Sequence, residues 1–497
     1  MKHSAYCGDD VVGLELPPDV EVAHASPPLA PLGDVRGALL HALANPVGMA
    51  PLEELLVRGM KLTIAFDDAC LPVPPMRNDV RRQIVDVVLE LAARRGIREE
   101  SVRLICAVGL HRKWTKRELA HLIGERAYGE NVTNHDAEDP DGMVHLGTTE
   151  EGYEVDVNRA VLESDLTVYV NVTWTSMNGG WKSVAVGLGS ARSINQHHNA
   201  DVIGHGASIM EPERSAMHGV IDAMGKLIKT KARVFQIETV LNNDTWGRME
   251  SLVRPLGSAM RVLPPSVKGA LRNLARSEFA PIGFYAGSPE VVHVETLRHL
   301  YLQQNVAPRE QADVVIVGVP NLSPYGVFSD VNPVLFYNLL FGYIFSCYQR
   351  RPFLREGGTV IALNPVRARF HPRHHPSYAA FFRDVLPQLK ERSWRAIERE
   401  QMPRYTADEG YIERYRFDHA YHGVHPFYTF GMGHANRARC GRVLVVGAED
   451  AATVERLGLE AAPSLRSALA TAEGELGRKG VRVLLDMPPV FAFGGGG

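Results

Sequence analysis

The chain lacks the features of a disulfide-bonded, membrane-spanning or nucleic-acid-binding protein. Its 497 residues include only five cysteines, far apart and without a Cys-x-x-Cys pair, so neither a disulfide framework nor a zinc knuckle is expected. No apolar run approaches the roughly 20 residues of a membrane span, and we expect no secretory leader. The formal net charge of −3 gives no basis for nucleic-acid binding. We expect a protein of the reducing cytoplasm.

What is present is an alternation of apolar strands and amphipathic helices. In the first half, strands are expected at residues 61–66, 102–110 and 164–172, with one helix capped by Asn78 and another opened by a capping box at Thr115. Further strands are expected at residues 312–319, 358–363, 442–446 and 481–485. Near-continuous apolar strands alternating with helices are typical of parallel sheets covered on both faces.

We therefore predict an α/β fold with mainly parallel sheets in two domains. Residues 254–287 have weak periodicity and several Pro and Gly residues, so the boundary is placed there. The predicted domains are residues 1–270, which would bind a cofactor, and residues 271–497, which would close a cleft over the active site. Residues 1–35, rich in Pro and acidic residues, are expected to form an extended arm or short strands.

Three loops of the first half carry candidate catalytic or ligand-binding residues. In open parallel sheets, ligands bind beyond the carboxyl ends of the strands. The loops at residues 67–75, 109–115 and 173–182 leave such ends and contain Asp68, His111 and Lys182. Imidazole suits proton transfer at neutral pH, and Asp68 would orient such a base or hold a cofactor hydroxyl. The alternatives are a histidine that only hydrogen-bonds its loop and an aspartate that caps a turn.

Lys182 follows a glycine pair, Gly179-Gly180, and His198 comes sixteen residues later. A lysine after such a turn can be a covalent tether or an anion partner, and an imidazole can bind nickel, copper or zinc. Trp181 stands where a phosphate-binding P-loop needs glycine, so that motif is excluded. The ordinary alternative is a solvated lysine and a structural histidine.

Two groups of histidines in the second half have the spacing of metal ligands. Neither group has the nearby carboxylate or cysteine ligands of a standard zinc motif. We expect no metal site within either group, although one of these histidines can reach the site from the facing domain. Among the cysteines, Cys70 lies in a candidate loop without a neighbour in sequence that would activate its thiol. The two groups are His371, His374 and His375, and His419, His422 and His425.

Several motifs in the right order resemble the nickel-pincer-nucleotide-dependent lactate racemase family over most of the chain. The loop at residues 68–74 resembles the family's Asp-x-x-Arg-Pro-x-Pro loop, and residues 109–112 resemble its Gly-Thr-His-Arg loop. Residues 179–182 resemble its tethering segment, and His198 stands at the family's distance from the tether. Shorter similarities are found at residues 42–48, 134–136, 146–148, 457–459 and 465–476.

The resemblance implies a cofactor and a set of roles. The cofactor would be the nickel-pincer nucleotide, a nickel complex of pyridinium-3-thioamide-5-thiocarboxylic acid mononucleotide, supplied by cofactor-biosynthesis enzymes. Lys182 would form the thioamide tether beside Gly179 and Gly180, and His198 would ligate nickel. His111 would take the hydroxyl proton of a 2-hydroxy substrate during hydride transfer, and Asp68 would support the base or the cofactor. The implied class is an isomerase, a racemase or epimerase.

The chain departs from the family where lactate is bound. Leu71 replaces the loop arginine, and a leucine cannot pair with a carboxylate. Val172 occupies the place of a second catalytic histidine, so a second base is missing or comes from elsewhere, such as His197 or a histidine of the second half. A substrate other than lactate is therefore expected, larger or less charged. Candidate substrate contacts are Leu71, Arg112, Trp174 and Trp181, with Arg192 and Arg367 as further anion partners.

Two alternatives stay open besides the racemase or epimerase. A one-faced oxidoreductase would use the same cofactor with His111 as its single base, which Val172 favours. A non-catalytic relative would bind the nucleotide without turnover, which the presence of Lys182, His198 and His111 disfavours. Interconversion of both stereoisomers is expected only of the racemase.

Overall fold

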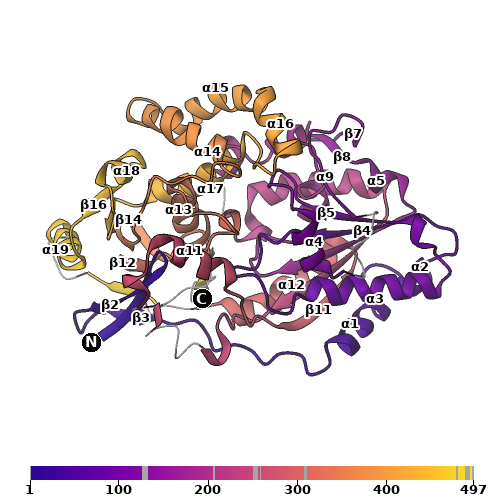
Figure 1. Cartoon of the computed structure of the whole chain (residues 1–497), viewed down its shortest axis with the longest axis horizontal. Helices are drawn as coiled ribbons and strands as arrows, with labels where there is room; N and C mark the ends of the chain where they lie inside the picture. Colours follow the sequence, from indigo (N-terminus) through magenta and orange to yellow (C-terminus); the bar gives the residue numbers. More distant parts are fainter. Residues whose placement is uncertain are drawn as a thin grey trace.

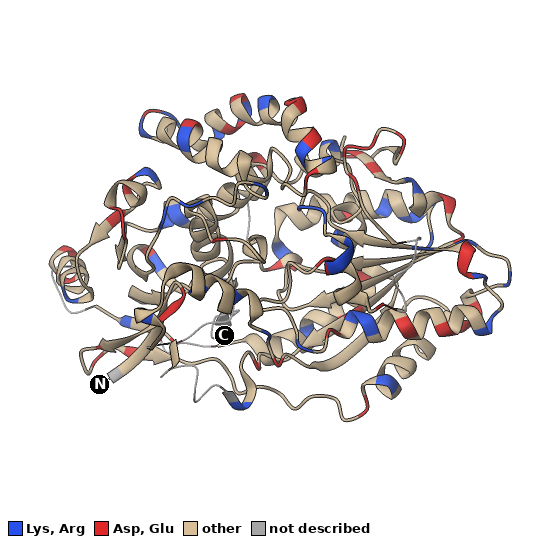
Figure 2. Ribbon diagram, viewed as in Figure 1, with Lys and Arg blue, Asp and Glu red and all other residues tan. Residues whose placement is uncertain are grey.

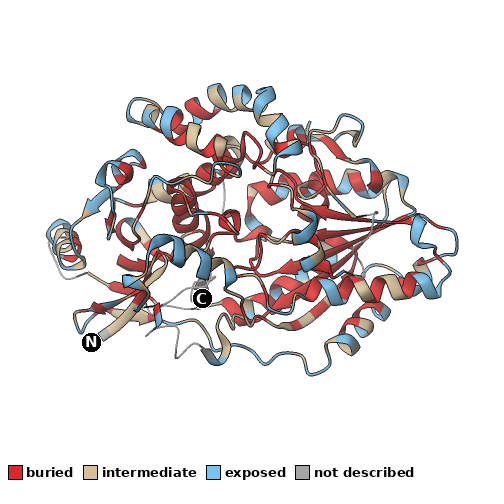
Figure 3. Cartoon of the chain, viewed as in Figure 1, coloured by how far each residue is buried: buried red, intermediate tan, exposed pale blue. Residues whose placement is uncertain are grey.

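The computed structural model describes residues 2–125, 132–204, 208–249, 256–257, 259–306, 310–476, 480–486 and 493–494. Two six-stranded sheets organise the chain and lie toward opposite ends of the view in Figure 1. Helices cover them, and the innermost strands are buried (Figure 3). This is the predicted α/β class with mainly parallel sheets, and the prediction is confirmed.

The first sheet has the order β11-β10-β9-β4-β5-β6, with all neighbours parallel except β10 and β11. Every residue of β9 and β10 is buried, as the apolar strand pattern predicts. The strands are β4 (Leu62–Asp67), β5 (Val102–Ala107), β6 (Val132–Asn134), β9 (Leu166–Thr173), β10 (Val234–Leu241) and β11 (Pro281–Gly287).

The second sheet has the order β16-β15-β14-β12-β17-β3, and all of its neighbouring strands are parallel. Its strands are β3 (Glu21–Ala23), β12 (Ala312–Gly318), β14 (Leu354–Leu363), β15 (Arg442–Val446), β16 (Glu460–Ala462) and β17 (Arg482–Leu485). Three strand pairs lie outside the two sheets: β1 (Lys2–Cys7) with β2 (Asp10–Glu15), β7 (Met143–Thr148) with β8 (Glu154–Asn158), and β13 (Tyr348–Gln349) with β18 (Phe493–Gly494).

The longer helices are α1 (Val35–Ala44), α3 (Val80–Arg94), α4 (Lys116–Ile123), α9 (Ala216–Lys231), α11 (Pro265–Leu274), α12 (Pro289–Gln304), α15 (Trp394–Thr406), α16 (Glu409–Phe417), α17 (His425–Arg439) and α19 (Leu465–Leu476). Shorter ones are α2 (Leu52–Leu55), α5 (Arg159–Glu163), α6 (Lys182–Ala185), α7 (Ala191–Asn195), α8 (Ala200–Ile203), α13 (Pro333–Tyr337), α14 (Pro376–Ala380) and α18 (Ala451–Arg456). Acidic and basic side chains are interspersed along the outer helices (Figure 2). No described helix is long and apolar enough to cross a membrane.

Local sequence signals explain most element boundaries. The capping box at Thr115 is formed, because Thr115 and Glu118 each satisfy the other's backbone N–H at the start of α4. The prediction that Asn78 caps the preceding helix, α3, is wrong, since Asp79 is its cap and the Asp79 side chain accepts from the Arg81 N–H. Both residue types are good caps, so the register depends on packing of the apolar face.

The predicted domain boundary at residue 270 stays a prediction. Strand β11, which follows it, pairs with β10 of the first sheet. The early strand β3 pairs with β17 near the other end of the chain. The termini therefore meet in the second sheet, and the N-terminal segment runs along both halves before it enters the first sheet.

Candidate active site

The three predicted loops meet at one pocket, beyond the carboxyl ends of β4, β5 and β9. The pocket encloses about 950 Å³, including the part that opens to solvent. Asp68, His111, Lys182 and His198 all line it, as do Gly179 and Leu71. The fold thus brings together the side chains predicted to meet beyond the strand ends.

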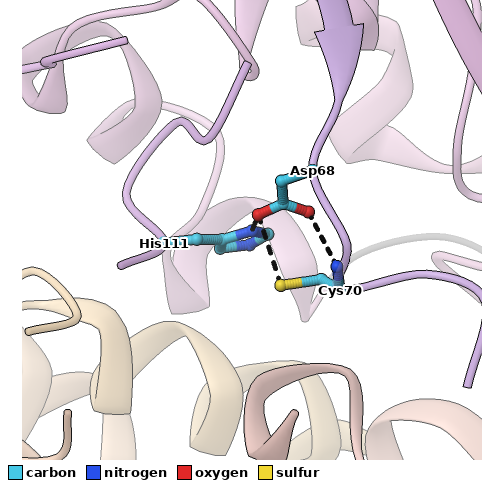
Figure 4. Close-up of side chains that lie close together, drawn as sticks. All are labelled: Asp68, Cys70 and His111. Atoms are coloured by element: carbon cyan, nitrogen blue, oxygen red, sulfur yellow. Dashed lines mark hydrogen bonds and ion pairs between the residues drawn. The ribbon is translucent and has the colours of Figure 1, made fainter. Parts of the chain in front are cut away.

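His111 and Asp68 form a hydrogen-bonded pair at the pocket wall. The His111 Nδ1 atom lies 2.9 Å from Asp68 Oδ2, and Figure 4 shows the carboxylate between His111 and Cys70. The Cys70 thiol and the Trp114 indole also donate to Oδ2, each at 3.3 Å, and the Cys70 N–H donates to Oδ1 at 3.0 Å. Burial alone would raise the pKa of Asp68, but His111 and the Cys70 donors hold that pKa below its usual value.

Arg81 on α3 holds the loop that carries Asp68 through hydrogen bonds to its backbone. The Arg81 guanidinium donates to the carbonyls of residues 67, 68 and 71, and its remaining donors bind Asp79. Its side chain is only 1% exposed, so this cation serves the loop rather than the pocket. Asp67 is held separately by Tyr169, Asn171 and the Val172 N–H, and burial raises its pKa to about 6.

Lys182 begins the short helix α6 directly after the glycine turn. Both glycines have positive φ, 129° for Gly179 and 56° for Gly180, a region that L side chains rarely adopt. The turn is clamped by Glu238, which accepts the Gly180 N–H at 2.7 Å and pairs with His293 at 3.0 Å. A Cβ on Gly179 would lie 2.4 Å from His293 Nδ1. The glycine pair is thus required by packing within the protein, and Gly180 is not among the lining residues.

The Lys182 amine points into an environment that favours its neutral form. Burial lowers the pKa of Lys182 to about 8, although the Asp67 carboxylate acts in the opposite direction. Among the described residues, its one recorded hydrogen bond is a long one, 3.4 Å to Asn178 Oδ1. A buried amine at a pocket wall, with a larger neutral fraction than an ordinary lysine, is suited to covalent attachment.

His198 lies across the same pocket on the segment after α7. Its Nδ1 is 2.7 Å from the Nδ1 of His197, and no other hydrogen bond to the ring is recorded within the described residues. Burial, His197 and Lys182 hold the pKa of His198 well below its usual value. The ring is therefore neutral at pH 7. In the tautomer whose Nδ1–H donates to His197, the Nε2 lone pair is available as a metal ligand.

The opposite wall of the pocket comes from the second half of the chain, and no sequence pattern predicts its residues as a group. We call it the C-terminal wall: Pro324, Tyr325, Tyr343, His425, Tyr428, Thr429 and Met432. The rings of Tyr325 and His425 stand 5.2 and 5.3 Å from that of His111, between ring centres. Tyr378 fixes His425 through a 2.6 Å contact with its Nδ1. His425 is one of the six clustered histidines of the second half, of which one is expected to reach the site. Nothing in their spacing distinguishes it from the other five.

Several predicted contacts lie outside this pocket. The Arg112 side chain is 1% exposed and binds Glu118 at 2.7 Å, and Trp174 lines a separate cavity. Trp181 is buried against Gly225 of α9. Val172 is buried within β9. Arg192 pairs with Asp156, and Arg367 with Glu449.

The remaining clustered histidines serve local contacts. His422 pairs with Glu138 at 2.9 Å, and His419 Nδ1 lies 2.8 Å from the Lys113 carbonyl oxygen. The rings of His371 and His374 stack at 3.9 Å, and His375 Nε2 contacts the Tyr325 carbonyl oxygen at 3.0 Å. Only His425 of the six reaches the described lining of the pocket.

Comparison with known proteins finds similarity to lactate racemases. Residues 7–211 match the family model of the lactate racemase N-terminal domain. The lactate racemase of Lactiplantibacillus plantarum is 28% identical over 209 residues, which are 41% of this chain and 47% of that protein. The lactate racemase of Thermoanaerobacterium thermosaccharolyticum is 27% identical over 167 residues, 33% of this chain and 38% of that protein. The matched segments thus span less than half of these relatives.

The fold similarity extends further than the sequence similarity. The structure of the lactate racemase apoprotein from T. thermosaccharolyticum superposes with a TM-score of 0.66 at 17% identity, covering 98% of each chain. A crystal structure of a Thermotoga maritima protein gives a TM-score of 0.56 at 14% identity, covering 94% of this chain and 99% of that one. Residues 7–211 are thus similar to the lactate racemase N-terminal domain. The chain as a whole shares the fold of the lactate racemase apoprotein.

Proposed function

We propose that the chain is a racemase or epimerase of a 2-hydroxy acid or related carbinol that works with a nickel-pincer nucleotide. The observation that carries this proposal is the convergence of Lys182, His198, His111 and Asp68 on one pocket. The curated relatives are lactate racemases, which supports the same class of reaction. The proposed active site therefore lies between the loops of the first sheet and the C-terminal wall.

The residues fit the cofactor that the family implies. A tether needs a neutral amine, and Lys182 has a pKa of about 8 because it is buried. A nickel ligand needs an unprotonated imidazole nitrogen, and the neutral His198 ring lines the pocket. These two residues would hold the group. When bound, it would supply hydride acceptance and return at the carbinol carbon.

The protein's own part in the reaction is proton transfer and orientation. With its Nδ1 proton directed at Asp68, His111 keeps Nε2 as an acceptor for the hydroxyl proton of the substrate. Asp68 fixes that tautomer and stabilises the imidazolium that forms. Four donors on its carboxylate hold it ionised and in place.

A substrate other than lactate is supported by the charges of the lining. Lys182 is the one lysine or arginine among the described lining residues, and it is assigned to the tether. Leu71, where the family has arginine, lines the pocket and offers only apolar contact. Tyrosine, methionine and threonine make up most of the C-terminal wall. Such a surface favours a larger, less charged group beside the carbinol.

The proposal is tested by intact-mass and nickel analysis of protein produced together with the cofactor-making enzymes. We expect a mass adduct and about one nickel per chain, both lost in Lys182→Ala and both retained in the control Lys226→Ala, an exposed lysine of α9. Absence of the adduct, under conditions that load an authentic lactate racemase, would contradict the tether assignment and the proposal with it.

A one-faced oxidoreductase is the second candidate, and Val172 is the observation in its favour. That side chain is buried in β9 and offers no base where the family has histidine. His425 supports the racemase instead, because it supplies a second imidazole at the pocket. Conversion of each stereoisomer into the other is expected of the racemase. In His425→Phe that conversion should fall, while formation of the 2-oxo compound from one stereoisomer continues.

A further inference from the structure

Three side chains with metal-ligating atoms meet at the pocket wall, and the proposed reaction uses only two of them. The ligand atoms of Asp68, Cys70 and His111 all lie within 4.8 Å of one another. Cys70 is the member without a role in proton transfer. Its thiol nevertheless points at the same carboxylate oxygen that His111 contacts (Figure 4).

We propose that Cys70, His111 and Asp68 form a binding site for a thiophilic divalent cation of the Zn²⁺ class. The ligands would be Cys70 Sγ, His111 Nδ1 and a carboxylate oxygen of Asp68. Sulfur, imidazole and carboxylate are the donors that zinc takes in proteins. This site is separate from Lys182 and His198, so it goes beyond the proposed function.

The spacing of the donors is already close to that of a tetrahedral zinc site. Zinc bonds of about 2.3 Å to sulfur and about 2.0–2.2 Å to nitrogen and oxygen put the ligand atoms roughly 3.3–3.6 Å apart. Here Asp68 Oδ2 is 2.9 Å from His111 Nδ1 and 3.3 Å from Cys70 Sγ. Replacing the two hydrogen bonds by metal bonds thus requires only small outward shifts.

The surroundings hold these donors in place and leave one side open. Arg81 binds the backbone carbonyls of residues 68 and 71 on either side of Cys70. Tyr421 lies 3.9 Å from the thiol, and Trp114 donates to the carboxylate from behind. All three ligands line the pocket, so a fourth position can be taken by water from that side.

Binding would change the protonation of His111 in a defined way. The thiol proton leaves to solvent as the thiolate binds, and the imidazole proton moves from Nδ1 to Nε2. His111 then presents an N–H to the pocket where the proposed reaction needs an acceptor. We therefore expect the cation to inhibit the enzyme reversibly. This inhibitory arm rests on the proposed function, whereas the cation site does not.

The site is tested first with Co²⁺ on the purified chain, because a cobalt–thiolate bond gives a charge-transfer absorption that oxygen and nitrogen ligands do not. We expect the absorption to saturate at about one Co²⁺ per chain and Zn²⁺ to displace it. It should be lost in Cys70→Ser and retained in Cys347→Ser, a buried thiol outside the pocket. No absorption in the native chain, its persistence in Cys70→Ser or its loss in the control would each overturn the proposal.

A second measurement separates this site from the proposed function. Zinc affinity should fall about tenfold or more in Cys70→Ser and in His111→Ala, because each removes a direct ligand. On cofactor-loaded protein, the Zn²⁺ concentration that halves the rate should rise by the same factor in Cys70→Ser, relative to the uninhibited rate of that variant. Unchanged zinc affinity in either variant would contradict the site, whether or not the protein turns over substrate.

Discussion

The two walls of the pocket differ in chemistry and in how they are built. The first-half wall consists mainly of loops at strand ends and carries two aspartates, a lysine and two histidines. The C-terminal wall comes from a short turn at Pro324, the irregular helix at Asn338–Ile344 and the start of α17, and it is mainly aromatic. The family model matches residues 7–211, which contain the first wall and none of the second.

This difference between the walls indicates which part of the pocket tolerates amino-acid substitution. Reactive groups at strand ends are fixed by the sheet, so their positions depend little on the rest of the chain. The C-terminal wall is set by how α17 and its neighbours pack, which tolerates replacement of one apolar or aromatic side chain by another. We infer that the first wall performs most of the proposed chemistry and that the second, apart from His425, selects the substrate.

The largest effect is expected from removing the proposed base. His111→Ala should lower turnover by about 10²–10⁴-fold, because proton transfer by a positioned side chain contributes that much. His121→Ala, an exposed histidine of α4, is the matched control and should leave turnover unchanged. Steady-state kinetics on cofactor-loaded protein measures both. Equal rates in the two variants would remove His111 from the chemistry.

The reactivity of Lys182 should reveal its buried position. With a pKa of about 8 rather than 10.5, the amine is protonated below pH 8 and neutral above it. At pH 8 its neutral fraction is about 100-fold larger than that of an ordinary lysine. Mass-resolved labelling of cofactor-free protein with a small amine reagent should show Lys182 labelling rise with a midpoint near pH 8. A midpoint near that of Lys226 would contradict the account of its environment.

Variants of His198 and Lys182 should distinguish nickel ligation from covalent attachment of the cofactor. His198→Ala should keep the covalent mass adduct but lose nickel on dialysis, with affinity about 10–100-fold lower or worse. Lys182→Ala should lose both. Metal analysis paired with intact-mass spectrometry distinguishes these outcomes, and full nickel retention in His198→Ala would assign the ligand elsewhere.

A smaller effect is expected at the glycine turn. Gly179→Ala should destabilise the fold by about 1–3 kcal/mol, because it imposes a disfavoured backbone conformation. Its Cβ would also clash with His293 and Glu238. Gly357→Ala is the control, since it has φ of 73° but no atom within 4 Å of its added Cβ. Chemical denaturation compares them, and equal losses would show that the contacts behind the turn contribute nothing.

The sequence predicts the first wall better than the second for a physical reason. The strands at residues 61–66 and 164–172 are mainly apolar. The ends of such parallel strands converge at one sheet edge, which brings Asp68 and Lys182 together. Tyr325, Tyr343 and His425 belong to three separate segments without a shared period. Their meeting depends on how those segments pack, which no local pattern encodes.

Single residues show the same limit. Arg112 follows His111 in sequence, yet its guanidinium turns away to bind Glu118 at the start of α4. Trp174 extends β9 but lines a different cavity. Position along the chain therefore predicts which loop a residue belongs to and leaves the direction of its side chain to packing.

The most direct test of the central claim is a comparison of substrates on cofactor-loaded protein. We would measure kcat/KM for interconversion of the stereoisomers of lactate and of a 2-hydroxy acid with a phenyl side chain. A pocket with Leu71 and an aromatic C-terminal wall predicts a preference of about tenfold or more for the phenyl compound. Equal or faster conversion of lactate would contradict the claim that the second wall has changed the substrate.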